Sequence, residues 1–214
     1  MDLGHFCGWL VPARCPLCRR VADPNVLVCG ECVRELNRSP VLRGDPPEGV
    51  DRIASCADHD GVARELLGAF KFRHLTGLGP LIAGFMADAA GPQGEGQPIM
   101  VPVPPARVRT WLRGFDPVAL LAAEVARLTG TPLPDDPLLA RRGHGRQRGR
   151  GRAGRLADPP DIRPLEGAAR KLGGREVLLI DDVMTTGSTL ATAAGAVRQA
   201  GAASVSALTF TRRL

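Results

Sequence analysis

The chain has 214 residues, a hydrophobic content of 44% and a formal net charge of +6 at pH 7. This length suits one α/β domain of ordinary size with a small appendage, and the apolar content excludes wholesale disorder. No uninterrupted apolar stretch reaches the roughly 20 residues needed to span a bilayer, and the start, MDLGHFCGWLVPARC, lacks the features of a secretory signal. We therefore expect a cytoplasmic protein without membrane insertion.

The positive charge is carried almost entirely by arginine, because Lys71 and Lys171 are the only lysines among 28 basic residues. Together with the abundance of Ala, Gly and Pro, this indicates the codon bias of a GC-rich genome, so we discount part of the arginine signal. Basic proteins often bind polyanions such as nucleic acids. However, 4% aromatic residues and no tyrosine leave few surfaces on which single-stranded bases could stack.

Two C-x-x-C pairs occur near the start of the chain, CPLC at Cys15 and Cys18 and CGEC at Cys29 and Cys32. Each pair presents two thiolates from one tight turn, and four thiolates suit tetrahedral Zn²⁺. A disulfide is disfavoured in a reducing cytosol, and a thioredoxin-like redox site needs a single C-x-x-C at a helix start. We expect a structural zinc site, because a closed four-thiolate shell leaves no open position for chemistry. Two further cysteines are expected to be small buried hydrophobic residues: Cys7 and Cys56.

A segment rich in Pro, Gly and charge, Ser39–Gly49, predicts a boundary after this module. We divide the chain there into a zinc-binding module, residues 1–45, and a larger α/β domain, residues 46–214. Arg52–Ala57 is predicted to form an edge strand, and Asp60 is placed to cap the first of two helices that follow. Apolar residues recur at helical spacing in both helices and should be core: Ala63, Leu66, Leu67 and Phe70, then Leu78, Leu81, Ile82, Phe85 and Met86.

A second strand pattern, Ile99–Val103, runs into the segment PVPPARVRTWLRGFDP. Prolines end this strand, and Asp116 and Pro117 then take the cap and first positions of a helix. The arginines between them come to the carboxyl end of the strand, where ligands bind in open α/β sheets. Such a loop is suited to a diphosphate, and the alternative is a solvated surface. The arginines are Arg107, Arg109 and Arg113.

Residues 140–160, ARRGHGRQRGRGRAGRLADPP, carry seven arginines among glycines without apolar periodicity. We expect a mobile loop in the free protein. Three interpretations stay open: an active-site loop that closes over a ligand, a nucleic-acid contact, or a solvated linker. Gly-Arg repeats bind phosphate backbones without recognising sequence, so nucleic-acid binding by this loop would fall steeply with salt.

Glu176–Leu190, EVLLIDDVMTTGSTL, combines an apolar strand, two acidic residues and a turn of small residues before a helix. The apolar run is typical of a strand in a parallel sheet covered on both faces. Asp181 and Asp182 follow where this strand is predicted to end, and we expect both carboxylates to face solvent. A helix over 188–200 and a strand over 204–211 complete an alternating β/α order. This order predicts an α/β fold with a mostly parallel sheet and helices on both faces.

The turn after the acids suits a phosphate. The first amides of a helix lack intrachain acceptors and carry the positive end of its dipole, so a bound phosphate satisfies them. Gly187 permits a positive φ and a close approach of the backbone to the ligand. Asp181 and Asp182 repel a phosphate, so their partners should be neutral hydroxyls or a cation, and a sugar phosphate supplies both. Hydroxyl donors to the phosphate are expected from Thr185, Thr186, Ser188 and Thr189.

Thirteen residues of this segment resemble the phosphoribosyl diphosphate (PRPP) signature of the type I phosphoribosyltransferases, an apolar strand followed by two acids and a Thr-Thr-Gly loop. The resemblance implies that Asp181 and Asp182 bind the ribose 2′- and 3′-hydroxyls, and that the Thr185 to Thr189 loop holds the 5′-phosphate. The alternative is an ordinary strand-turn-helix, which needs neither two adjacent acids nor five small residues.

With the V-P-V-P strand, the R-G-F helix start and the four N-terminal cysteines, nearly the whole chain resembles the competence protein ComF family, also described as amidophosphoribosyltransferase-like. The resemblance implies that residues 46–214 form a phosphoribosyltransferase-like domain whose diphosphate loop is Val103 to Phe115. Arg113 and Gly114 are its most informative residues. Asp116 stands where the family usually has Asn, which would weaken a contact with an anionic ligand. The family's Arg/Gln-containing segment corresponds to Gln147 and Arg155.

Two functional hypotheses follow. The first is an enzyme that transfers the phosphoribosyl group of PRPP to an amine or base, with Mg²⁺ and arginines stabilising the leaving diphosphate; its catalytic residues would be Asp181, Asp182 and Arg113. The second, from the resemblance to the ComF family, is a protein that handles single-stranded DNA and whose PRPP site is regulatory or vestigial. The sequence names no acceptor, and it leaves turnover and the oligomeric state open. Alanine at both acids should abolish PRPP binding and leave the fold intact.

Overall fold

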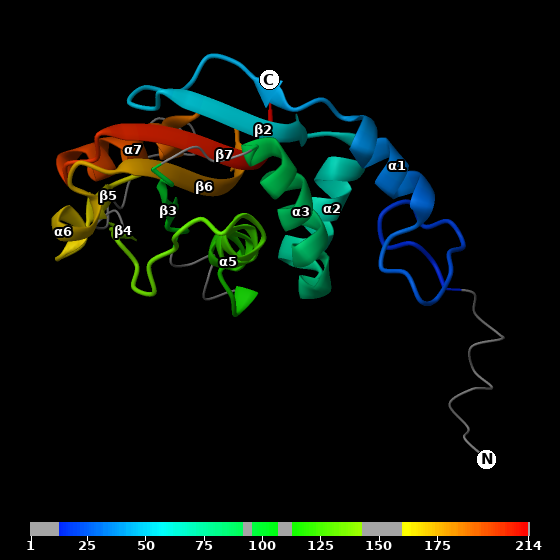
Figure 1. Cartoon of the computed structure of the whole chain (residues 1–214). Coiled ribbons are helices and arrows are strands. Elements are labelled where there is room, and N and C mark those ends of the chain that lie inside the picture. The colour runs from blue at the N-terminus through cyan, green and yellow to red at the C-terminus, as the bar shows by residue number, and fades with distance from the viewer. Residues whose placement is uncertain (1–12, 92–95, 107–112, 143–159, 214) are drawn as a thin grey trace, which may run out of the picture.

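A five-stranded sheet with the strand order β1-β2-β7-β6-β3 forms the centre of the molecule. The computed structural model describes residues 13–91, 96–106, 113–142 and 160–213. Four of the five strands run parallel, and β1 is antiparallel to β2. The predicted α/β class with a mostly parallel sheet is confirmed (Figure 1). The strands are β1 (Leu42–Arg43), β2 (Arg52–Asp58), β3 (Ile99–Pro102), β6 (Glu176–Met184) and β7 (Ser204–Arg212).

Helices cover both faces of this sheet (Figure 1). On one face lie α2 (Gly61–Phe72), α3 (Gly79–Ala90) and α5 (Pro117–Thr129). The opposite face is covered by α7 (Ser188–Gln199) and α6 (Ala168–Leu172). The apolar run of β6 therefore divides between two cores, since successive side chains of a strand point to opposite faces.

Side chains of β6 show this division directly. Leu178 and Ile180 belong to the core under α2, α3 and α5, whereas Val177 and Leu179 belong to the core under α7. All four are buried. A strand covered on both faces has no polar alternation, which is why a continuous apolar run was the correct sequence signal.

The prediction that Arg52–Ala57 forms an edge strand is wrong. Strand β2 lies between β7 and the two-residue β1, which pairs with it through Leu42 and Arg43. Strand β1 lies within the Pro- and Gly-rich stretch that predicted a boundary, so the local sequence gave no strand pattern. At the opposite edge of the sheet lies β3.

The two predicted helix caps differ in the structure. Asp116 accepts hydrogen bonds from the amides of Val118 and Ala119 at 2.9 and 3.1 Å, and Pro117 takes the first position of α5, as predicted. Asp60 precedes α2 at the expected position, but its side chain makes no capping hydrogen bond. The cap at Asp116 fixes the entry of α5 next to the carboxyl end of β3.

The N-terminal module is packed against α2. Its helix α1 (Gly30–Arg38) and the side chains of Leu17 and Leu36 share one apolar core with α2. The Arg73 guanidinium donates a 2.7 Å hydrogen bond to the Pro16 carbonyl. A short 3₁₀ turn, η3 (Thr76–Leu78), connects α2 to α3. The division into residues 1–45 and 46–214 stays a prediction.

An antiparallel ribbon of β4 (Leu139–Arg141) and β5 (Ile162–Pro164) brackets most of the arginine-rich segment. Residues 143–159 of that segment, including Gln147 and Arg155, lie outside the described residues, so the prediction of a mobile loop is untested. Among the helices that the structure describes, none has the length and apolar character that crossing a membrane requires.

Candidate functional site

The acidic pair lies within the last four residues of β6, not beyond its end. Pairing with β7 continues through Asp181 and Val183 to Met184. Asp182 points to the α2 side of the sheet and is 8% exposed, whereas Asp181 is half-buried. The prediction that both carboxylates face solvent is therefore wrong for Asp182, because the strand keeps its alternation through the acids and turns this one toward a helix.

The partner of Asp182 is Lys71, near the end of α2. Its Nζ lies 2.6 Å from Asp182 Oδ2, and the two side chains are 12% and 11% exposed. An ion pair this deeply desolvated depends on both partners, since either charge alone would be costly to bury. Sequence reasoning missed Lys71 as a site residue. Its one signal was compositional: it is one of two lysines in a chain whose other basic residues are arginine.

The pKa of Asp181 is strongly shifted from its ordinary value. Burial raises the pKa of Asp181 to about 8, and the neighbouring Asp182 carboxylate adds to the shift, while Lys71 and Arg141 act in the opposite direction. The Asp182 amide donates a 2.8 Å hydrogen bond to Asp181 Oδ1. A carboxyl with a raised pKa next to a second carboxylate is suited to bind neutral hydroxyl groups.

The small-residue turn has the geometry expected of an anion-binding loop. Gly187 adopts φ 76° and ψ −5° immediately before α7, so the predicted positive φ is confirmed. It is buried, while the hydroxyl residues Thr185, Thr186 and Ser188 around it are exposed. The Thr186 hydroxyl donates to Ser188 Oγ at 3.2 Å. These hydroxyls therefore gather in front of the N-terminus of α7, where helix amides point outward.

Replacing Gly187 by alanine should displace this loop. A Cβ at that position would lie 2.7 Å from Cγ of Pro47, and the left-handed conformation costs a non-glycine residue about 1–2 kcal/mol. We expect a comparable loss of unfolding free energy in urea titrations, together with weaker binding of any phosphate ligand. Gly195→Ala in the same helix is the matched control, because its Cβ would meet nothing within 4 Å and should be slightly stabilising. Equal stability of the two variants would contradict this prediction.

The start of α5 brings Arg113 and Gly114 to the same end of the sheet. Gly114 has φ 73°, and Phe115 packs edge-on against Phe70 and His74, with ring centroids 5.9 and 6.0 Å apart. The Arg113 guanidinium lies 4.7 Å from the ring centroid of Phe72. Of the three predicted loop arginines, Arg107 and Arg109 lie outside the described residues.

Electrostatic effects connect these elements. Burial raises the pKa of Asp116, the Asp182 carboxylate raises it further, and Arg113 lowers it. Burial lowers the pKa of His59, which follows β2, and the charges of Lys71, Arg64 and Arg213 lower it further. Its Nδ1 lies 2.9 Å from Thr211 Oγ1. The carboxyl end of the sheet thus combines the carboxyls of Asp116, Asp181 and Asp182 with several cationic side chains. His59 is a second site residue that sequence reasoning missed.

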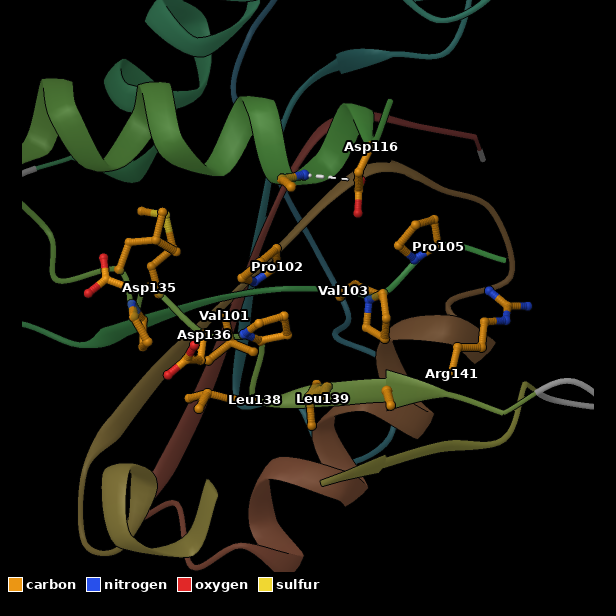
Figure 2. Close-up of a pocket in the computed structure, with 17 residues that line it drawn as sticks. Val101, Pro102, Val103, Pro105, Asp116, Asp135, Asp136, Leu138, Leu139 and Arg141 are labelled. Carbon is orange, nitrogen blue, oxygen red and sulfur yellow. Dashed lines mark hydrogen bonds between the residues drawn. The ribbon is translucent and has the colours of Figure 1, made fainter. Parts of the chain in front are cut away.

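A cavity of about 560 Å³ opens between α5, β3 and β4 (Figure 2). Its floor is the proline-rich end of β3, where Pro102 and Pro104 lack the amide that another residue would offer. Figure 2 shows the Asp116 carboxylate pointing into the cavity from α5 and Arg141 at its rim. Asp181 and Asp182 lie outside its lining, and Arg141 connects the two regions because its charge acts on Asp181.

The four cysteines of the N-terminal module form one cluster. All four sulfurs lie within 4.8 Å of one another, with Cys15 and Cys32 buried and Cys18 and Cys29 half-buried. Sγ atoms are 3.9 Å apart in the pair Cys15–Cys32 and 3.6 Å apart in the pair Cys18–Cys29. A tetrahedral zinc with Zn–S bonds of about 2.3 Å separates neighbouring sulfurs by about 3.8 Å. The thiols are therefore placed to bind a metal.

The fifth described cysteine behaves as predicted for a hydrophobic residue. Cys56 is buried in β2, and burial raises the pKa of its thiol to about 12. Cys7 lies outside the described residues.

The fold and the site define the class of protein: an α/β domain with a mostly parallel sheet, an acidic pair and a glycine turn before α7, and a cysteine-rich module at its N-terminus. The chain is 30% identical over 206 residues to competence protein ComFC of Bacillus subtilis (strain 168), covering 92% of this chain and 77% of the relative. It therefore belongs to the ComFC family. DNA utilization protein YhgH of Salmonella typhi is 26% identical over 208 residues, covering 94% of this chain and 84% of that protein.

Similar solved structures include the allosteric regulatory enzyme of purine biosynthesis, with a TM-score of 0.39 and 16% identity. Glutamine PRPP amidotransferase from B. subtilis, complexed with ADP and GMP, has a TM-score of 0.40 and 18% identity. These likenesses cover 61% and 60% of this chain, and this chain spans a quarter of the length of each. No family model matches the chain.

Proposed function

We propose that the chain binds PRPP with Mg²⁺ at the carboxyl end of β6. The observation that supports this most strongly is the left-handed, buried Gly187 between exposed hydroxyl residues at the N-terminus of α7, directly after an acidic pair. In this proposal Thr185, Thr186, Gly187, Ser188 and Thr189 hold the 5′-phosphate. Asp181 and Asp182 accept hydrogen bonds from the ribose hydroxyls.

The diphosphate of the ligand belongs on the cationic side of the site. Arg113, which precedes α5, acts electrostatically on Asp116. Gly114 and Arg109 are carried over from the sequence prediction. Mg²⁺ keeps several waters and is typically held by phosphates with one or two carboxylates. Asp181 and Asp182, in the last residues of β6, are the carboxylates proposed to take part in holding it. The bound ion would neutralise part of the charge of a leaving diphosphate.

Phosphoribosyl transfer is the reaction that such a site suits. Loss of diphosphate leaves positive charge on the ribose ring, so the chain's own contribution is to position the ribose with the acids and stabilise the leaving group with Arg113. The acceptor would be an amine or a base. Release of diphosphate in the presence of an acceptor is the measurement that tests for turnover.

The four-cysteine cluster supports a structural zinc ion in the same proposal. The sulfur separations fit a tetrahedral four-thiolate shell, and this donor set favours Zn²⁺. Cys15, Cys18, Cys29 and Cys32 would fill every coordination position, so this metal would stabilise the module and take no part in transfer. A cytoplasmic location, where the thiols stay reduced, remains our prediction.

A second candidate function is handling of single-stranded DNA, with PRPP as a regulatory ligand. The names of the two relatives, a competence protein and a DNA utilization protein, favour it. The net charge of +6 and the cationic side chains around His59 are consistent with a nucleic-acid partner. Binding should then weaken steeply as salt is raised.

Isothermal titration with PRPP and Mg²⁺ tests the first proposal. We expect saturable binding that Gly187→Ala weakens and Gly195→Ala leaves unchanged. A diphosphate-release assay with amines, bases and single-stranded DNA then separates the two functions, since acceptor-dependent release identifies an enzyme and binding without release identifies a ligand-gated factor. Absence of PRPP binding by the wild-type protein would remove the proposed site.

A further inference from the structure

Phe72 is an aromatic side chain that the fold leaves uncovered. It is the last residue of α2 and is 66% exposed, in a chain with only six phenylalanines and no tyrosine. The other rings near it have structural roles, because Phe70 is buried in the core and Phe115 contacts it edge-on. Phe72 belongs to neither hydrophobic core, so packing does not explain why an aromatic residue stands at this exposed position.

One side of the Phe72 ring carries a cation. The Arg113 guanidinium lies 4.7 Å from the ring centroid, within the range of a cation–π contact. Two residues further on, Phe115 packs edge-on against Phe70 and His74, which anchors the backbone that carries Arg113. A flat guanidinium and a flat ring are thus placed together before any ligand binds.

The pair lies next to the acidic centre. Lys71, the residue before Phe72, forms the ion pair with Asp182 at 2.6 Å. Arg113 acts electrostatically on Asp116, which in turn responds to Asp182. The pair therefore lies at the same end of the sheet as the site proposed for the ribose.

The charges around the pair select the class of ligand. Two cations lie at the pair itself: the Arg113 guanidinium over the Phe72 ring, and Lys71 one residue before Phe72. An apolar peptide would gain nothing from these cations, whereas a nucleobase attached to phosphate gains from both the ring and the charges. Base stacking on an aromatic ring with an adjacent arginine is the usual way in which proteins hold unpaired bases.

We infer that Phe72 and Arg113 form a stacking platform for a nucleobase beside the acidic pair. The base could belong to single-stranded DNA or be a free base awaiting phosphoribosyl transfer. The free base rests on the proposed phosphoribosyl transfer, and single-stranded DNA rests on the second candidate function. In both cases the ring of the base lies on Phe72, and its phosphate or the PRPP ligand lies among the cations.

The test compares Phe72→Ala and Phe72→Leu with the wild type. The first arm measures binding of a fluorescent oligothymidine of about 15 nucleotides at low salt, and the second measures binding of adenine and cytosine in the presence of PRPP and Mg²⁺. Because stacking contributes about 1–3 kcal/mol per base, we expect the affinity of Phe72→Ala and Phe72→Leu to fall by about 5- to 100-fold in at least one arm. Leucine keeps the apolar volume and lacks the aromatic face, so it should lose as much as alanine, whereas Phe72→Trp should retain binding.

Leu128→Ala is the matched control, because Leu128 is 45% exposed near the other end of α5 and should leave both arms unchanged. Three results would overturn the inference. They are wild-type affinity of Phe72→Ala in both arms, wild-type affinity of Phe72→Leu in both arms, and no binding of either ligand by the wild type. PRPP titration of the wild type is recorded in parallel. If the wild type binds PRPP and the Phe72 variants bind both ligands as the wild type does, the platform alone is refuted. If Phe72→Ala loses oligonucleotide binding and the wild type does not bind PRPP, the proposed PRPP function alone is refuted.

Discussion

Asp182→Ala should lower the free energy of unfolding by about 3–5 kcal/mol, because it leaves the Lys71 ammonium desolvated without a counter-charge. The sequence alone predicted that the acids could be replaced without cost to the fold. The structure reverses that expectation for one of them, since Asp182 is buried and joined to α2. Urea titration followed by circular dichroism measures the effect.

A double replacement separates the ion pair from the loss of packing. Lys71→Met with Asp182→Asn removes both charges and keeps side chains of similar volume, so we expect most of the lost stability to return. Asp181→Asn is a second control, because Asp181 is half-buried and the Lys71–Asp182 pair stays intact. An unfolding midpoint of Asp182→Ala equal to that of the wild type would show that this pair contributes nothing.

The ion pair also changes how binding experiments should be designed. The Asp181→Ala, Asp182→Ala double variant would lose PRPP affinity through an altered fold as well as through lost contacts. The Lys71→Met, Asp182→Asn protein and Asp181→Asn remove the carboxylates one at a time without isolating a buried charge. Loss of affinity in these proteins, at unchanged stability, is what assigns the acids to the ligand.

Local patterns in the sequence were sufficient for most of the fold. The helices α2, α3 and α7 and the cap of α5 at Asp116 follow from periodicity and from residues adjacent to each helix end. Asp60 makes no capping hydrogen bond, and two larger errors, in the sheet, are both tertiary. The place of β2 inside the sheet depends on a two-residue partner, and the extension of β6 through Asp181 and Asp182 depends on pairing with β7.

The same limit separates the predicted and missed parts of the site. Motif spacing identified Gly187 and the cysteines, because each motif is contiguous and its geometry is set by neighbouring residues. Lys71 and Phe72 are distant in sequence from their partners Asp182 and Arg113, so no window of the sequence relates them. What links them is the packing of α2 against the carboxyl end of the sheet.

Cys15→Ser should release the proposed zinc and destabilise the whole protein. Leu17, Val28 and Leu36 of the module lie in the same core as α2. Each apolar side chain of this kind contributes about 1.5–3 kcal/mol when buried, so exposing all three would cost on the order of 5 kcal/mol. We therefore expect a single unfolding transition at a much lower temperature, measured by circular dichroism alongside metal analysis by mass spectrometry.

Cys56→Ser is the control for this experiment, since Cys56 lies in β2 outside the cluster and its loss should leave the metal content unchanged. A strong chelator added to the wild type should reproduce the behaviour of Cys15→Ser. The zinc assignment would be contradicted if the wild-type protein contained no zinc, or if the chelator left its thermal unfolding midpoint unchanged. Because the shared core joins the module to α2, and α2 carries Lys71 and Phe72, metal loss should also weaken ligand binding at the acidic end of the sheet.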